Sequence, residues 1–151
     1  MVRRKAILEV RHSNCGEMNS HNWWQDTYWT IYDDYTIRAK IEHFIHEEKN
    51  KSIEKKLTSE EHKRILNYIE HIKKEDEDIM ALDGTEWALK QYSNGRLIYE
   101  RKPEPIYDIK SFEILGYALY RIMGLFLLDD HTIYSPSPDY ASYRASGSFL
   151  P

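Results

Sequence analysis

Cysteine is nearly absent, since Cys15 is the only one in the 151-residue chain. A single cysteine excludes an internal disulfide framework and any zinc site built from several thiolates. Long apolar runs are also missing, because the most apolar stretch, 114–128, is short and interrupted by Arg121. No apolar segment follows Met1 to Lys5 that resembles a secretory signal. The sequence therefore predicts a cytoplasmic protein that does not associate with a membrane.

Positive charge is not in surplus either. Lys and Arg number 21 against 25 Asp and Glu, which gives a net charge of −4. This balance disfavours a general nucleic-acid binder, because affinity for the phosphate backbone needs an excess of cations. Valine is scarce, with 2 copies against 16 of isoleucine, which is typical of an A+T-rich coding sequence and indicates a bacterial or phage origin.

Strand-like alternation dominates the first third of the chain. Residues 5–11, 26–32 and 35–45 each place apolar side chains at every second position. Asp33-Asp34 separates the last two runs and predicts a hairpin turn. The charged segment 46–56 is expected to form a connection or a weak edge strand.

Two segments carry helical periodicity. Thr58 and Glu61 match a capping box, and the apolar stripe that follows predicts a helix over 59–74. Asp108 is the expected N-cap of a second helix over 109–128, which is apolar enough to lie centrally against a sheet. Gly116 and Gly124 lie eight residues apart in it, and we interpret them as points of close approach to a strand.

Between the helices, Asp83-Gly84 and Asn94-Gly95 are typical type I′ turn dipeptides. They divide the segment into predicted strands over 79–82, 85–93 and 96–101.

The sequence thus predicts an α+β fold in the order βββ-α-βββ-α, with two helices packed on antiparallel sheet(s). Residues 1–129 are expected to form one domain, with an internal duplication of about 1–74 and 75–129 as a further hypothesis, and 130–151 to form an extended tail. The expected core is Trp29, Ile31, Ile37, Ile41, Leu66, Ile69, Trp87, Leu89, Phe112, Leu115, Leu119 and Ile122.

Several clusters contain groups that are able to act in catalysis or metal binding. They are His43 with His46, Cys15 with His12 and His21, the acidic run 75–78, and the run 129–131. None has the spacing of a known metal or nucleophile motif, so the sequence predicts no catalytic residue, no metal site and no cofactor. A small hydrolase or metal-dependent nuclease that uses His12, His21 or the acidic runs remains an alternative hypothesis.

The loop over 12–25 and the tail carry the predicted contact residues. Both segments lack regular periodicity yet are rich in large side chains that commonly anchor protein interfaces. The predicted partner-binding residues are Met18, Trp23, Trp24, Tyr140 and Tyr143. The leading functional hypothesis is a non-enzymatic protein-binding module, such as an inhibitor of a nuclease or defence complex or an immunity-type protein. A single-stranded nucleic-acid binder is the other alternative.

Overall fold

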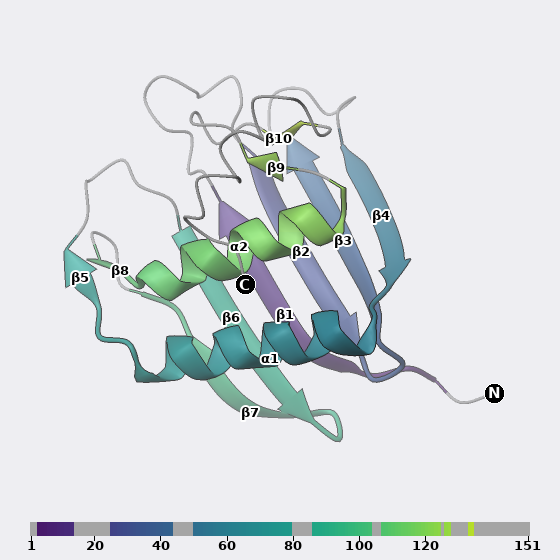
Figure 1. Ribbon diagram of the computed structural model, residues 1–151, viewed down its shortest axis with the longest axis horizontal. Coiled ribbons are helices and arrows are strands. Elements are labelled where there is room, and N and C mark those ends of the chain that lie inside the picture. Colours follow the sequence, from purple (N-terminus) through teal and green to yellow (C-terminus); the bar gives the residue numbers. More distant parts are fainter. Residues whose placement is uncertain are drawn as a thin grey trace.

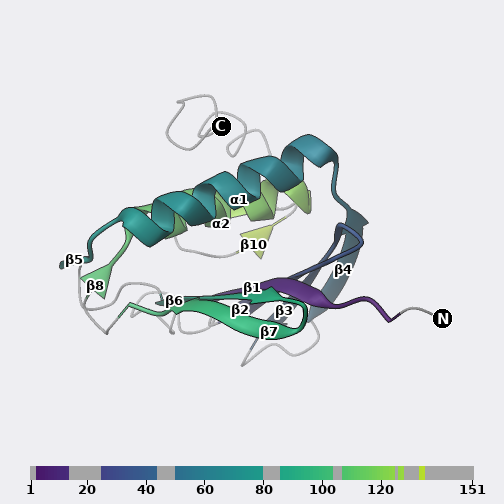
Figure 2. The same ribbon diagram turned by 90° about the horizontal axis from the view of Figure 1, so that it is seen from below.

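The computed structural model describes residues 3–13, 25–43, 50–79, 86–103, 107–124, 126–127 and 133–134. Within them, six antiparallel strands form one sheet, and two helices cover one of its faces (Figures 1 and 2). The strands of this sheet lie in the spatial order β4-β3-β2-β1-β6-β7. The predicted α+β class is confirmed.

The sheet joins the strands that precede and follow the first helix. β1 (Ala6–Ser13) lies between β2 (Gln25–Tyr32) and β6 (Glu86–Ser93), so the two sets of strands form one layer. β3 (Thr36–His43) and β4 (Lys51–Lys56) complete one side, and β7 (Arg96–Arg101) completes the other. The charged segment before the first helix is thus an edge strand, which is one of its two predicted forms.

Two short ladders lie outside the main sheet. β5 (Asp78–Ile79) pairs with β8 (Tyr107–Asp108), and β9 (Phe126–Leu127) pairs with β10 (Ile133–Tyr134). The prediction that a strand near 79 joins the β6–β7 hairpin is therefore wrong for the part that the structure describes. β5 pairs with β8, which follows β6 and β7 in the sequence. No pattern of neighbouring residues indicates a pairing between strands so far apart.

Helix α1 (Ser59–Lys74) begins with the predicted capping box. The Glu61 amide donates to the Thr58 hydroxyl oxygen over 3.1 Å, and the Thr58 amide donates to the Glu61 carboxylate over 2.8 Å. The helix runs antiparallel to α2 (Lys110–Ile122) above the sheet (Figure 1). Neither helix is both long and apolar enough to cross a bilayer, as judged on the described residues.

The core lies between the helices and the sheet. Ten of the twelve predicted core residues are at most 5% exposed. The exceptions lie on helices: Ile122 is only partly buried, and Leu66 is 37% exposed. Leu66 was predicted wrongly because the buried stripe of α1 consists of Ile65, Ile69 and Ile72, at intervals of four and three. A residue next to Ile65 lies about 100° further around the helix.

The second helix differs from the prediction at both ends. It stops at Ile122 and not at 128, because Gly124 adopts a left-handed φ of +73° that ends the α conformation. Asp108 is not the N-cap: that position is Ile109, which offers no side-chain hydrogen bond. The Glu75 carboxylate, which follows α1, instead accepts hydrogen bonds from the Ser111 amide over 2.9 Å and from the Ser111 hydroxyl over 2.7 Å.

Replacing Glu75 by alanine should destabilise the fold by about 0.5–2 kcal/mol, the usual contribution of a side-chain helix cap. The carboxylate also lies near the positive end of the α2 dipole, which adds to the effect. Urea denaturation measures this loss as a lower transition midpoint. The matched control is Glu77→Ala, which removes an exposed carboxylate two residues away. Equal losses in the two variants would contradict the capping role.

Candidate functional site

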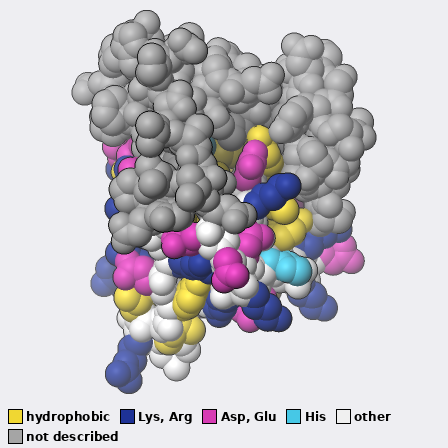
Figure 3. Space-filling model, turned by 90° about the vertical axis from the view of Figure 1, so that its left-hand side faces the viewer, with side chains coloured by type: hydrophobic (Ala, Val, Ile, Leu, Met, Phe, Trp, Pro, Cys, Tyr) yellow, Lys and Arg dark blue, Asp and Glu magenta, His cyan; other side chains and the backbone are white. Residues whose placement is uncertain are grey.

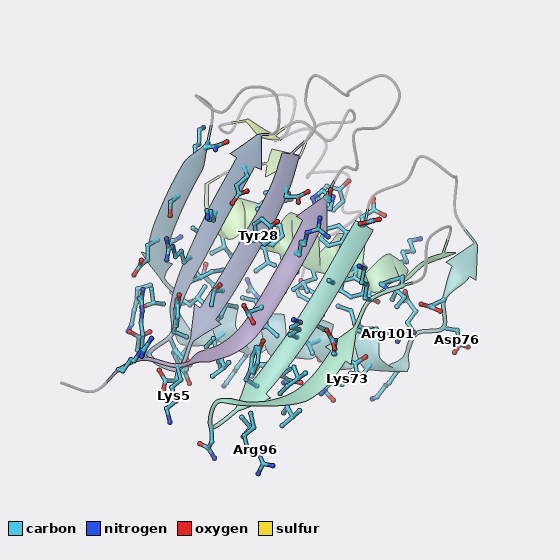
Figure 4. The ribbon with its side chains drawn as sticks, turned by 180° about the vertical axis from the view of Figure 1, so that it is seen from behind. Lys5, Tyr28, Lys73, Asp76, Arg96 and Arg101 are labelled. Carbon is cyan, nitrogen blue, oxygen red and sulfur yellow. The ribbon has the colours of Figure 1, made fainter. Side chains whose placement is uncertain are left out.

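The second face of the sheet is not covered by any helix or strand of the described residues (Figures 2 and 4). A hollow of about 370 Å³ lies on this helix-free face, over β2, β1, β6 and β7. Two of the residues that line it, Thr30 and Ala88, have short side chains, which leaves space between their longer neighbours. The other residues that line the hollow are Glu9, Val10, Arg11, Tyr28, Trp29, Lys90, Glu100 and Lys102.

A buried carboxylate organises one side of the hollow. Asp26 is 2% exposed, and its Oδ2 atom accepts hydrogen bonds from Arg11 Nη2 over 2.8 Å and from the Tyr28 hydroxyl over 3.1 Å. Strand alternation places Asp26 and Tyr28 on the same face of β2, and the β1–β2 register places Arg11 directly opposite Tyr28. We call these three residues the Arg11–Asp26–Tyr28 cluster.

The pKa values of Tyr28 and Arg11 are both raised, so both side chains remain hydrogen-bond donors. Burial, reinforced by the Asp26 carboxylate, raises the pKa of the Tyr28 hydroxyl, so this group stays protonated and donates. Burial lowers the pKa of Arg11, but the hydrogen bond and charge of Asp26 outweigh that effect and raise it overall. The Arg11 guanidinium lies 5.9 Å from the centre of the Tyr28 ring and 3.7 Å from Glu86. The hydrogen bond to Asp26 is therefore the strong contact of Arg11, and its contacts with the Tyr28 ring and with Glu86 are weaker.

The cluster keeps part of its surface open. Tyr28 is 36% exposed, and the Arg11 side chain is 33% exposed. Figure 4 shows Tyr28 on the viewer's side of the strands, with the helices behind the sheet. An aromatic ring and a guanidinium are thus presented to solvent by neighbouring strands and held in place from below by a carboxylate.

The charges around the cluster are balanced. Lys90 lies 3.9 Å from Glu100 across the β6–β7 ladder, and Lys40 lies 3.1 Å from Glu42 on β3. The Tyr92 hydroxyl donates to Glu9. Side chains of both signs are also interspersed on the side of the molecule that Figure 3 shows. Such a surface does not concentrate positive charge as a phosphate-backbone binder requires.

His12, the candidate base of the hydrolase hypothesis, lies in the core. Its side chain points to the helix-covered side, where it is 2% exposed and stacks on Trp87 with ring centres 4.1 Å apart. The Tyr120 hydroxyl lies 2.8 Å from its Nδ1 atom and donates to Thr27 over 3.0 Å. A general base must reach the proton that it removes, and this imidazole is enclosed by core side chains.

The other sequence-predicted residues are only partly within the described structure. Met18, Trp23, Trp24, Tyr140 and Tyr143 lie outside the described residues, as do Cys15, His21, His46 and residues 129–131. The structure therefore does not test the predicted contact loop and tail. In the acidic run, Glu75 caps α2. The described residues contain no group of three or more His, Cys, Asp or Glu that is arranged to hold a metal ion.

Sequence reasoning missed the Arg11–Asp26–Tyr28 cluster. The alternation over 26–32 correctly placed Tyr28 on the polar face of its strand, but nothing local indicated that Asp26 is buried. The available signal was an acidic residue two positions before a tyrosine in a strand, with Arg11 in the preceding strand. The pairing itself depends on the register between β1 and β2.

Comparisons with protein-family models, curated proteins and solved structures gave no match to this chain.

Proposed function

We propose that this protein is a non-enzymatic protein-binding module that contacts its partner through the helix-free face of the sheet. The observation that carries the proposal is the Arg11–Asp26–Tyr28 cluster at the edge of an open hollow. Tyrosine and arginine are among the residues that contribute most to protein interfaces. Here both are presented by a rigid sheet, so little conformational entropy is lost when a partner binds.

The chemistry of this face favours a protein over a nucleic acid. Several of its charged residues form pairs of opposite sign, which fit a partner surface of mixed charge and give little attraction to phosphates. The hollow offers space for one or two side chains of a partner beside Tyr28. Trp23 and Trp24 stay predicted contacts, and Trp24 precedes Asp26 by only two residues in the sequence. Met18, Tyr140 and Tyr143 stay predictions as well.

The narrower role rests on size, charge and residue usage. A small, mildly acidic protein of bacterial or phage origin fits an inhibitor of a nuclease or defence complex, or an immunity-type protein, that acts in the cytoplasm. Such a protein functions by occluding a surface of its target, for which a broad, open sheet face is well shaped.

Site-specific photo-crosslinking tests the proposed surface. A photoreactive residue at Thr30, on the helix-free face, should capture a defined partner in lysate of the native host. The matched control places the same residue at Asn67, an exposed position on α1. A partner captured from both positions, or only from Asn67, contradicts the proposed face. Capture of nucleic acid from Thr30, with binding that weakens steeply as salt rises, would instead support the nucleic-acid alternative.

Replacing Tyr28 by alanine should weaken binding of that partner by about thirtyfold or more, as expected for the loss of an interface anchor. The melting temperature should fall only modestly, because the ring lies on the open side of the sheet and Arg11 still pairs with Asp26 when the Tyr28 hydroxyl is lost. Calorimetric titration and thermal melting of the same preparation measure the two effects. Tyr35→Ala is a matched control, since Tyr35 is a similarly exposed tyrosine outside the hollow. Loss of stability without loss of affinity would refute the anchor role.

A further inference from the structure

A second, smaller hollow lies on the helix-covered side of the molecule, where α1, the end of α2 and β4 meet. It encloses about 130 Å³. Ile65, Ala118 and Ile122 form its apolar part, and Tyr68 also lines it. The remaining lining residues are Lys55, Glu61, Arg64 and Arg121. This volume leaves room for a small ion and is much smaller than a drug-sized pocket.

Positive charge exceeds negative charge in this hollow. Glu61 is the one carboxylate among the described lining residues, and the Thr58 amide donates to it in the capping box of α1. Arg64 lies 4.0 Å from Glu60, at the limit of an ion pair, and Glu60 is largely exposed. Among the described residues, no carboxylate lies within ion-pair distance of Arg121. Lys55 donates one hydrogen bond, over 3.0 Å, to the carbonyl oxygen of Ile122 and retains two further donors.

The Tyr68 hydroxyl is a buried polar group that lacks a hydrogen-bond partner among the described residues. A buried hydroxyl without a partner is unfavourable, so it calls for an acceptor. Burial raises the pKa of this phenol, although the charges of Arg64 and Arg121 oppose the shift. The group is therefore a neutral donor close to two guanidinium groups.

We propose that this hollow binds a phosphate group, held by Arg64, Arg121 and Lys55, and that the Tyr68 side chain turns so that its hydroxyl donates to one of the phosphate oxygens. Guanidinium groups offer paired donors that match the oxygens of a phosphate. Three cations around one small site favour a dianion over a singly charged carboxylate.

A structural role accounts for only part of this arrangement. Lys55 and Arg121 lie near the end of α2, where the helix dipole attracts cations. That explanation does not supply an acceptor for the Tyr68 hydroxyl or a reason for Arg64. A phosphate group accounts for all of them together. The proposal is independent of the protein-binding function, because the residues of α1 and α2 that line this hollow lie on one side of the sheet and the helix-free face lies on the other (Figure 2).

Calorimetric titration with inorganic phosphate, at constant ionic strength and near neutral pH, tests the proposal. Saturable binding of one phosphate per chain is expected. Arg121→Gln should weaken it by about tenfold or more, the effect of losing a charge-assisted hydrogen bond. The control Lys63→Gln removes an exposed cation of α1 outside the hollow and should change affinity less than twofold, well under a tenfold step. Glycerol 3-phosphate distinguishes the source: tighter binding than inorganic phosphate identifies a phosphate ester as the ligand.

A second variant separates binding from folding. Tyr68→Phe should leave the melting temperature unchanged or higher in phosphate-free buffer, since the hydroxyl has no partner there. It should also reduce the stabilisation that phosphate gives the native protein. Three results would overturn the proposal: no saturable binding, equal binding of acetate at the same ionic strength, or equal effects of Arg121→Gln and Lys63→Gln.

Discussion

Replacing Leu119 by alanine should lower the free energy of unfolding by about 2–5 kcal/mol, because it deletes core contacts and leaves a cavity. Leu119 is completely buried, and it follows Phe112 and Leu115 along the face of α2 that packs on the sheet. Leu119 belongs to a core of buried aliphatic and aromatic side chains, and close packing of such a core limits how far the structure is able to close the gap. Urea denaturation should show a lower midpoint with an unchanged slope.

The matched control for this prediction is Leu66→Ala on α1. The same atoms are removed, but Leu66 is 37% exposed, so the loss should stay below about 1 kcal/mol. The pair of variants compares one chemical change at a core and at a surface position. If the two variants lose similar stability, the buried face of α2 has been assigned wrongly.

The elements that were predicted well are those whose signal is local. Alternation in β2 and β3 identifies the buried face from consecutive residues, and the capping box places the start of α1 to the residue. Each signal needs only a few neighbouring side chains. The order of the strands in the sheet was harder to predict. No local pattern indicates that β1 lies between β2 and β6, or that β5 pairs with β8. These arrangements depend on contacts distant in sequence.

Helix α2 shows how a strong local signal misleads. The apolar residues continue past Ile122, so periodicity alone extends the helix to 128. A glycine inside a helix is unfavourable by only about 1 kcal/mol, which is too little to identify a helix end from sequence. Its N-terminal cap was equally hidden, because Glu75 is separated from Ser111 by 36 residues. A partner so distant along the chain becomes visible only when the two helices are placed side by side.

In the candidate site, too, features that depend on neighbouring residues were predicted and features that depend on distant contacts were not. The exposure of Tyr28 follows from alternation, whereas the burial of Asp26 and its hydrogen bond to Arg11 depend on the pairing of two strands. Similarly, the phosphate hollow takes its residues from β4, α1 and α2. Sequence reasoning therefore favoured clusters of neighbouring residues, such as the loop that contains Trp23 and Trp24, over sites assembled from separate elements.

Gly116 is a position where a local prediction and the tertiary structure agree. The prediction of close approach to a strand is confirmed, since a Cβ atom on this residue would lie 2.2 Å from Cη2 of Trp87 on β6. For Gly124 the same prediction is wrong within the described part of the chain, because a Cβ atom there would meet none of its atoms within 4 Å. The indole of Trp87 has little room to retreat, since it stacks on His12 at 4.1 Å and on Phe112 at 5.9 Å between ring centres.

Replacing Gly116 by leucine should therefore lower the free energy of unfolding by about 3 kcal/mol or more, at the upper end of the effect of overpacking a core. Leucine is the better helix former by close to 1 kcal/mol, so the propensity of the new residue opposes the loss. A destabilised variant would show that packing against Trp87 outweighs propensity. Thermal and urea unfolding measure the net effect.

A double-mutant cycle assigns the loss to Trp87. Trp87→Ala alone should be unfavourable by about 3–5 kcal/mol, because it empties a large core volume. In the double variant the leucine on α2 enters the space that the indole vacates, so the combined loss should be smaller than the sum of the single losses by about 1–3 kcal/mol. Additive losses would show that the two sites do not interact, and that the indole is not what requires glycine at position 116. A coupling of the expected sign would establish that α2 is held against β6 by one ring fitted to a helix backbone without a side chain.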